Sequence, residues 1–203
     1  MYLIKVEMAR YLPEVRQALA DCQKMHQLVT GLFDAARQDA NILYRTNFVA
    51  DQLHLYLYAS APVTAAATER YRVMQRDLTP WLEQLQMGQC LKFDLIASPS
   101  KKVSMDGKKN SRRRILREPA ERQTWLERKA AQSGFIIFQV LEQEQILVSG
   151  KHHEEKGGTM YHDAYHYQGV LQIMDAEVFR HALQSGIGSG KAYGFGMMMV
   201  KKL

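Results

Sequence analysis

Residues 90–98 read CLKFDLIAS, in which apolar and polar side chains alternate. Such alternation is typical of a strand that buries one face. A helix pattern opened by Pro119, two β-rich stretches, a helix pattern after Asp175 and a final apolar run follow it in that order. The pattern over residues 91–203 therefore predicts one domain with the order strand, helix, strand, strand, helix, strand (βαββαβ).

The first half of the chain begins with the same order. YLIKVEM (residues 2–8) predicts a strand, and an amphipathic helix starts at Pro13 and reaches about residue 33. ILYRTN and QLHLYLYA predict two short strands that pair. Residues 63–87 give a mixed pattern, from which we predict no element. Two such units in succession predict an α+β fold of two tandem ferredoxin-like (βαββαβ) domains with antiparallel sheets, covering residues 1–90 and 91–203.

Composition restricts the class of protein. Hydrophobic residues make up 46% of the 203 residues and charged ones 24%, as in ordinary soluble proteins. The apolar stretches fall far short of the roughly 20 residues that cross a bilayer, and charges interrupt the N-terminal segment too often for a signal peptide. We therefore expect a cytoplasmic protein with no membrane partner. Cys22 and Cys90 are too few for a disulfide scaffold, so reduced thiols are expected.

Positive charge is concentrated in one segment. The formal net charge is +6, and residues 101–117 (KKVSMDGKKNSRRRILR) hold eight basic side chains opposed only by Asp106. A loop of this kind is either a solvated charged segment or a contact for a polyanion such as nucleic acid. We predict it to be a loop between a strand and a helix. Its candidate RNA-binding residues are Lys101, Lys102, Lys108, Lys109, Arg112, Arg113, Arg114 and Arg117.

Residues 186–196 read GIGSGKAYGFG and hold five of the 13 glycines. A Walker loop would need glycine where Ser185 stands and serine or threonine where Ala192 stands. A dinucleotide fingerprint follows a strand and opens a helix, whereas this run follows a helix and precedes the final strand. A tight helix-to-strand connection needs one or two glycines. The additional glycines and Lys191 favour contact with an extended polyphosphate backbone. The glycines concerned are Gly186, Gly188, Gly190, Gly194 and Gly196.

Four histidines between residues 152 and 166, His152, His153, His162 and His166, suggest a metal site, because two of them have the i, i+4 spacing of a helical zinc pair. The segment predicts a loop that passes into a strand, where this spacing does not converge on one ion. We therefore expect no metal and no other cofactor. The tyrosines at 161, 165 and 167 predict packing of the strand rather than stacking on bases.

Several segments resemble one family. GIG and GFG flank SGKAY near the end, MYLIKVEMAR opens the chain, and MHQL lies in the first predicted helix. MGQCLKFDLIASPSKK, WLERK and YQGVLQIMD follow in the middle and the second half. In this order and spacing the whole chain resembles the CasE endoribonucleases, which belong to the repeat-associated RNA-binding proteins of CRISPR systems.

The resemblance implies a function. CasE proteins cut the hairpin of a CRISPR repeat in precursor RNA on the 3′ side of its stem, without metal, and retain the product within Cascade. The implied partners are the repeat RNA, as precursor and as mature guide, and other Cascade subunits. The basic segment then docks on the RNA stem, which proteins recognise mainly through phosphates and shape.

His26 matches the position of the family's catalytic histidine. In metal-free cleavage the 2′-hydroxyl attacks the phosphorus, which leaves a 2′,3′-cyclic phosphate and a 5′-hydroxyl. One group accepts the proton of the 2′-hydroxyl and another protonates the leaving oxygen, and the ordinary pKa of histidine, about 6.5, suits either role.

Two alternatives stay open. His26 adjoins the apolar stripe at Cys22 and Val29, so it could be a packing residue. The family has a tyrosine three residues before the histidine, where this chain has Gln23. In place of that tyrosine, Lys24 or Lys191 could stabilise the charge of the phosphate. The chain could instead be an RNA-binding structural subunit that does not cut, and a cleavage assay separates the two functions.

Overall fold

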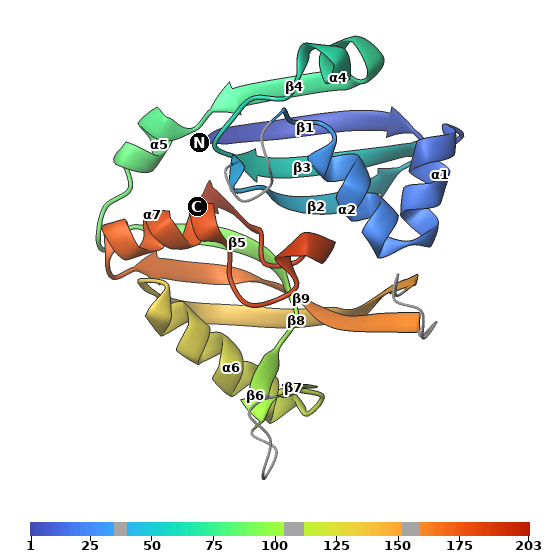
Figure 1. Ribbon diagram of the computed structural model, residues 1–203. Coiled ribbons are helices and arrows are strands. Elements are labelled where there is room, and N and C mark those ends of the chain that lie inside the picture. The colour runs from blue at the N-terminus through green and yellow to red at the C-terminus, as the bar shows by residue number, and fades with distance from the viewer. Residues whose placement is uncertain (35–39, 104–111, 152–158) are drawn as a thin grey trace.

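The computed structural model describes residues 1–34, 40–103, 112–151 and 159–203 (Figure 1). It contains two four-stranded antiparallel sheets with the strand orders β2-β3-β1-β4 and β10-β5-β9-β8. In each sheet the first and third long strands of the unit are central, and the second and fourth lie at the edges. This is the ferredoxin-like arrangement, so the predicted fold class is confirmed.

The first unit runs from β1 to β4. Its elements are β1 (Tyr2–Ala9), α1 (Pro13–Ala20), α2 (Cys22–Thr30), β2 (Leu43–Val49), β3 (Gln52–Ala59), α4 (Ala65–Arg70) and β4 (Arg72–Asp77). The short helix α5 (Thr79–Glu83) leads to the second unit. The strands predicted near residues 2–8, 42–47 and 52–59 are confirmed. α4 and β4, which lie in the segment without a prediction, complete the βαββαβ order.

The single helix predicted from Pro13 to about residue 33 is wrong. Asp21 has extended backbone angles, φ −150° and ψ 119°, and it separates α1 from α2. Its carboxylate accepts a hydrogen bond of 2.8 Å from the backbone N–H of Gln23, one of the amide groups that a helix start leaves without an internal partner. Asp21 therefore ends one helix and caps the next, and apolar periodicity alone cannot reveal such a break.

The second unit runs from β5 to β10. Its elements are β5 (Cys90–Ala97), β6 (Ser100–Val103), β7 (Arg112–Ile115), α6 (Pro119–Gln132), β8 (Phe135–Lys151), β9 (Thr159–Ile173), α7 (Ala176–Ser185), the 3-10 turn η1 (Lys191–Tyr193) and β10 (Met198–Lys202). Asp175 caps α7, since its carboxylate accepts from two backbone N–H groups.

Two sequence predictions for this unit are corrected. The basic segment is not simply a loop, because its two ends pair as the antiparallel hairpin β6–β7. The stretch from 150 to 163, predicted as a polar loop, belongs at both ends to strands, since β8 continues to Lys151 and β9 begins at Thr159. The domain boundary between residues 90 and 91 stays a proposal, and β5 begins at Cys90.

Helices cover one face of each sheet (Figure 1). In the first unit the strands' apolar side chains pack against α1, α2 and α4, with Val6, Leu55 and Val29 fully or almost fully buried. In the second unit Trp125 of α6 and Phe179 of α7 pack on the sheet. This burial stabilises each unit through the hydrophobic effect, at roughly 25 cal/mol for each Å² removed from water.

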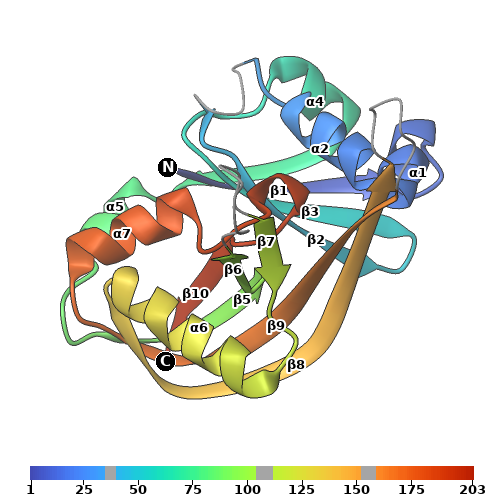
Figure 2. The ribbon, with the colours of Figure 1, turned by 60° about the horizontal axis from the view of Figure 1, so that its bottom comes forward.

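The uncovered faces of the two sheets meet. Leu43 and Tyr58 of the first unit pack with Met197 of the second, and Leu3, Tyr56 and Met199 surround them. β8 and β9 also reach across toward the first unit, and β8 lies beside α2 (Figure 2). We call this contact between the two units the seam. No helix of the described ranges is long and apolar enough to cross a membrane.

Candidate active site

The helix α2 carries His26 at the seam. Cys22, Met25 and Val29 are buried on one side of the helix and anchor it to the first sheet. His26 is half-buried, beside this apolar side, and Gln23 is half-buried one turn before it. Side chains three residues apart lie on the same face of a helix, so the Gln23 amide and the His26 imidazole share a face.

The glycine run from the far end of the chain meets this face. The Gln23 Nε2 donates a hydrogen bond of 3.1 Å to the phenol oxygen of Tyr193, in η1. Two further bonds cross the seam: the Tyr44 hydroxyl donates to the carbonyl of Ala192 at 3.0 Å, and the Asn41 amide donates to the carbonyl of Gln184 at 2.9 Å. The structure therefore joins the glycine run to the part of the first unit that carries His26.

Tyr193 also packs on β9. Its ring stacks on the imidazole of His162, with ring centroids 4.1 Å apart and an angle of 27° between the planes. Burial lowers the pKa of His162 below its ordinary value of 6.5, so this imidazole is neutral at neutral pH. Sequence reasoning missed Tyr193 and His162 as members of one site, since residues so far apart in the chain give no periodic signal.

The five glycines of the run have a conformational function. All have positive φ, between 74° and 87°, which other residues rarely adopt. At Gly190 a Cβ would lie 2.8 Å from the ring of Phe195, and at Gly196 it would lie 2.6 Å from the carbonyl oxygen of Ile187. The expectation that a tight connection needs only one or two glycines is therefore wrong, because close packing of the loop on itself requires more.

Lys191 is held inside the same loop. Its ammonium donates to the carbonyl of Ser185 at 2.5 Å, at the C-terminal end of α7. Lysine at this end of a helix satisfies a carbonyl that the helix leaves unpaired and interacts favourably with the helix dipole. A role of Lys191 in RNA binding stays a prediction.

The basic hairpin presents charge on two faces. Lys101 lies opposite Arg114 in the ladder, and both contact the carboxylate of Glu121 on α6, at 3.0 and 2.5 Å. The hydrogen bond from Lys101, only partly opposed by desolvation, and the contact with Arg114 lower the pKa of Glu121. One face of the hairpin is therefore tied to α6 by ion pairs.

The opposite face points away from α6. Lys102 and Arg113 lie opposite each other in the ladder, and both are exposed. An open hollow of about 680 Å³ beside the hairpin is lined by Arg113, Arg114 and Arg117 and also by Glu118 and Glu121. Arg117 lies 3.6 Å from Asp163 and is largely exposed. Of the other predicted contacts, the backbone of Arg112 belongs to β7, and Lys108 and Lys109 lie outside the described residues.

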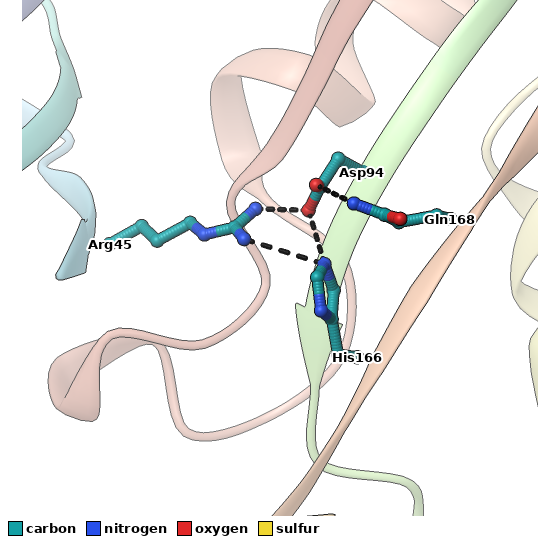
Figure 3. A network of polar contacts seen from close by, with 4 residues as sticks. All are labelled: Arg45, Asp94, His166 and Gln168. Atoms are coloured by element: carbon teal, nitrogen blue, oxygen red, sulfur yellow. Dashed lines mark hydrogen bonds and ion pairs between the residues drawn. The ribbon is translucent and has the colours of Figure 1, made fainter. Parts of the chain in front are cut away.

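A second polar cluster, missed by sequence reasoning, crosses the seam (Figure 3). Asp94 on β5 forms an ion pair with Arg45 on β2, and its carboxylate also accepts from the Gln168 amide at 2.7 Å. The imidazole Nε2 of His166 lies 2.8 Å from the same carboxylate and 3.4 Å from Arg45. Burial raises the pKa of Asp94, but the hydrogen bonds of Arg45 and Gln168, the Arg45 charge and His166 outweigh it, so the net pKa lies below 3.8.

The two histidines of β9, His162 and His166, contact different residues. His162 stacks on Tyr193, whereas His166 contacts Asp94. Within the ranges that the structure describes, no group of three or more histidine, cysteine, aspartate or glutamate side chains could hold a metal ion. His152 and His153 lie outside those ranges. Tyr165 and Tyr167 are buried in the core of the second unit, as the packing interpretation predicts.

Comparison with known proteins identifies relatives along the whole chain. The family model described as "CRISPR associated protein" matches residues 1–202. The Cascade subunit CasE of Escherichia coli is 30% identical over 217 aligned positions, which cover 100% of both chains. The CRISPR-associated endoribonuclease Cse3 of Thermus thermophilus is 33% identical over 130 residues, 60% of each chain. A structure of Cse3 endoribonuclease bound to a 19-nucleotide RNA matches with a TM-score of 0.85 at 24% identity, over 99% of this chain and 100% of that one.

Proposed function

This chain belongs to the CRISPR-associated protein family, and on that premise we propose that it is an endoribonuclease that cuts the repeat hairpin of CRISPR precursor RNA. Relatives named as an endoribonuclease and as a Cascade subunit support the proposal. The main observation behind the proposal is that α2, which carries His26, contacts the glycine loop, residues 186–196. This contact brings a proton-transferring imidazole and a phenol from opposite ends of the chain to one face.

The reaction that this face supports is metal-independent transesterification. His26 accepts the proton of a 2′-hydroxyl as that oxygen attacks the neighbouring phosphorus. The products carry a 2′,3′-cyclic phosphate and a 5′-hydroxyl. Because histidine can hold or release a proton near neutral pH, it suits this step, and such proton transfers typically accelerate a reaction roughly a hundred- to ten-thousand-fold.

The basic hairpin binds the stem of the repeat. Lys102 and Arg113 form its exposed face and contact phosphates directly, while Glu121 holds Lys101 and Arg114 in a fixed position beside them. Phosphate contacts fix the orientation of a bound duplex without reading its sequence. We assign the same role to the remaining basic residues of the segment, Lys108, Lys109, Arg112 and Arg117, and to Lys191.

The product stays bound after cleavage as the guide RNA of a Cascade complex in the cytoplasm. This assignment rests on the full-length likeness to a protein named as a Cascade subunit. We also place the glycine loop against the RNA, since backbone N–H groups suit phosphate oxygens.

One alternative function has a specific observation behind it. Gln23 occupies the place where the resembled family has a tyrosine, so the chain could bind the repeat as a structural subunit without cutting it. The two functions share the fold and the basic hairpin, and they differ only in the reaction.

A cleavage assay in EDTA tests the proposed function. The protein is incubated with end-labelled repeat RNA from the CRISPR array of the same genome. We expect a single cut, with a cyclic phosphate on one product and a 5′-hydroxyl on the other. Binding without cleavage would establish the structural alternative, and a requirement for a divalent ion would contradict the mechanism.

A further inference from the structure

We propose that Tyr193 is a catalytic residue whose phenol donates a proton to the 5′-oxygen that leaves when the RNA is cut. This proposal rests on the proposed function and names the second proton-transfer group that the reaction requires. Three sets of contacts at the seam support it: the bond to Gln23, the stack on His162 and the anchoring of the loop backbone.

The direction of the hydrogen bond matters. Gln23 donates its amide N–H to the phenol oxygen of Tyr193, so the phenol is the acceptor in this bond. A phenol that accepts one hydrogen bond still carries its own O–H proton, which it can donate. Since Gln23 and His26 share one face of α2, the bond holds the phenol over the face that carries the proton-accepting imidazole. The phenol and the imidazole therefore lie in the same part of the seam.

The phenol is also fixed in orientation. The Tyr193 ring stacks on the imidazole of His162. The backbone carbonyl of the preceding residue, Ala192, accepts a hydrogen bond of 3.0 Å from the Tyr44 hydroxyl. Gly190 and Gly194 bracket η1 with φ of 77° and 86°, and these left-handed turns set the direction in which Tyr193 leaves the backbone. A donor held in this way needs little reorganisation when the charge develops.

The proposed step balances. The O2′–P bond forms as the 2′-hydroxyl proton passes to His26, and the P–O5′ bond breaks with its electron pair going to O5′. The phenol proton of Tyr193 passes to O5′ and gives the 5′-hydroxyl. The imidazolium then returns its proton to water, and the phenolate takes one from water. Lys191, the other proton-bearing side chain of the loop, donates instead to the carbonyl of Ser185.

The test compares two substrates under single-turnover conditions. One is the natural repeat RNA, and the other carries sulfur in place of the 5′-oxygen at the scissile bond, mapped beforehand with the wild-type protein. A thiolate leaves without protonation, so a missing proton donor matters only for the oxygen substrate. We expect Tyr193→Phe to cut the natural RNA about 100-fold or more slowly and the sulfur substrate at nearly the wild-type rate.

Control variants separate chemistry from structure. Tyr11→Phe removes the phenol of an exposed residue that follows β1, so the ratio of its rates on the two substrates should equal that of the wild type. Gln23→Leu keeps the phenol but removes the amide that orients it, so it should lose part of the natural activity and regain it with sulfur. His26→Ala should cut both substrates slowly, because attack by the 2′-hydroxyl still needs a base.

Three outcomes overturn the proposal. An equal loss on both substrates in Tyr193→Phe would assign the phenol a purely structural role, and a wild-type rate on natural RNA would assign it none. If the wild-type protein cuts neither substrate, the proposed function itself fails and this assignment with it. RNA affinity and the unfolding midpoint of each variant, measured in parallel, show that the folded, RNA-binding protein was tested.

Discussion

Gly196 occupies a position where the backbone conformation and the space both favour glycine. Its φ is 84°, and an added Cβ would lie 2.6 Å from the backbone oxygen of Ile187. Its N–H donates to the carbonyl of Ile96 at 2.7 Å, which fastens the glycine loop to β5. Any shift of this residue therefore moves the loop that carries Tyr193.

Substituting Gly196 separates strain from steric clash, because Gly88 offers a matched control. Gly88 also has φ 84°, but nothing lies within 4 Å of the position of its Cβ. We expect Gly88→Ala to lower the free energy of unfolding by about 1–2 kcal/mol through backbone strain alone. Gly196→Ala should lower it by about 2–4 kcal/mol, since the clash adds to the strain. Urea unfolding measures both, and equal losses would contradict the packing described for the loop.

Individual residues of the site differ in how well the sequence predicts them. His26 was assigned through the resemblance of its surroundings to a family, and its catalytic role stays a prediction. Tyr193 lies 170 positions from its partner Gln23, and no local pattern encodes a contact of that kind. The sequence places Gln23 in a predicted helix and Tyr193 in a predicted loop, but only the folded chain brings them together.

At the scale of elements, local patterns predicted most strands and helices and failed where side chains compete with the backbone. β1, β3 and β5 alternate cleanly and were found from sequence. Asp21 breaks a continuous apolar stripe because its carboxylate caps α2, and that use of a polar side chain has no periodic signature. The basic hairpin was missed because like charges face each other in its ladder, which local propensity disfavours.

At the scale of elements, we expect the exposed face of the basic hairpin to contact RNA phosphates. Arg113→Ala should weaken binding to all repeat stems by a similar factor and reduce the slope of log affinity against log salt by about one. Arg76→Ala on β4 removes the same charge from an exposed position outside the hairpin, so its salt slope should match the wild type. An unchanged slope in Arg113→Ala would exclude this face from the phosphate contacts.

At the scale of the whole molecule, the seam between the two sheets brings the residues of the candidate site together. Apolar side chains around Tyr58 and Met197 form one part of it, and the ion pair of Arg45 with Asp94 forms another. Alternation indicates that Arg45 and Asp94 lie on the less apolar faces of their strands. It does not indicate that these faces meet, because that depends on how two complete units pack.

Asp94 gives the seam a pH dependence. The folded-state pKa lies below the ordinary 3.8, so the unfolded chain binds more protons as the pH falls through this range. The contribution of Asp94 to stability is therefore complete above about pH 3.8 and is lost as the pH drops through the folded pKa. We expect Asp94→Asn to lower the free energy of unfolding by about 1–3 kcal/mol at pH 7, with a smaller difference near pH 3.

Urea unfolding of the wild type and Asp94→Asn between pH 3 and pH 7 measures this difference. Asp51→Asn, at the exposed turn between β2 and β3, removes a carboxylate outside the seam and should have little effect. A difference between wild type and Asp94→Asn that does not change with pH would contradict the assigned ion pair.

In the proposed reaction His26 carries out the cleavage step, and one measurement tests this role most directly. His26→Ala is assayed for repeat-RNA affinity and for single-turnover cleavage in EDTA. Gln27→Ala, an exposed neighbour on the same helix, serves as the matched control. We predict that His26→Ala binds as tightly as the wild type and cuts about 100-fold or more slowly, whereas Gln27→Ala cuts normally. Cleavage by His26→Ala at the wild-type rate would contradict the assignment.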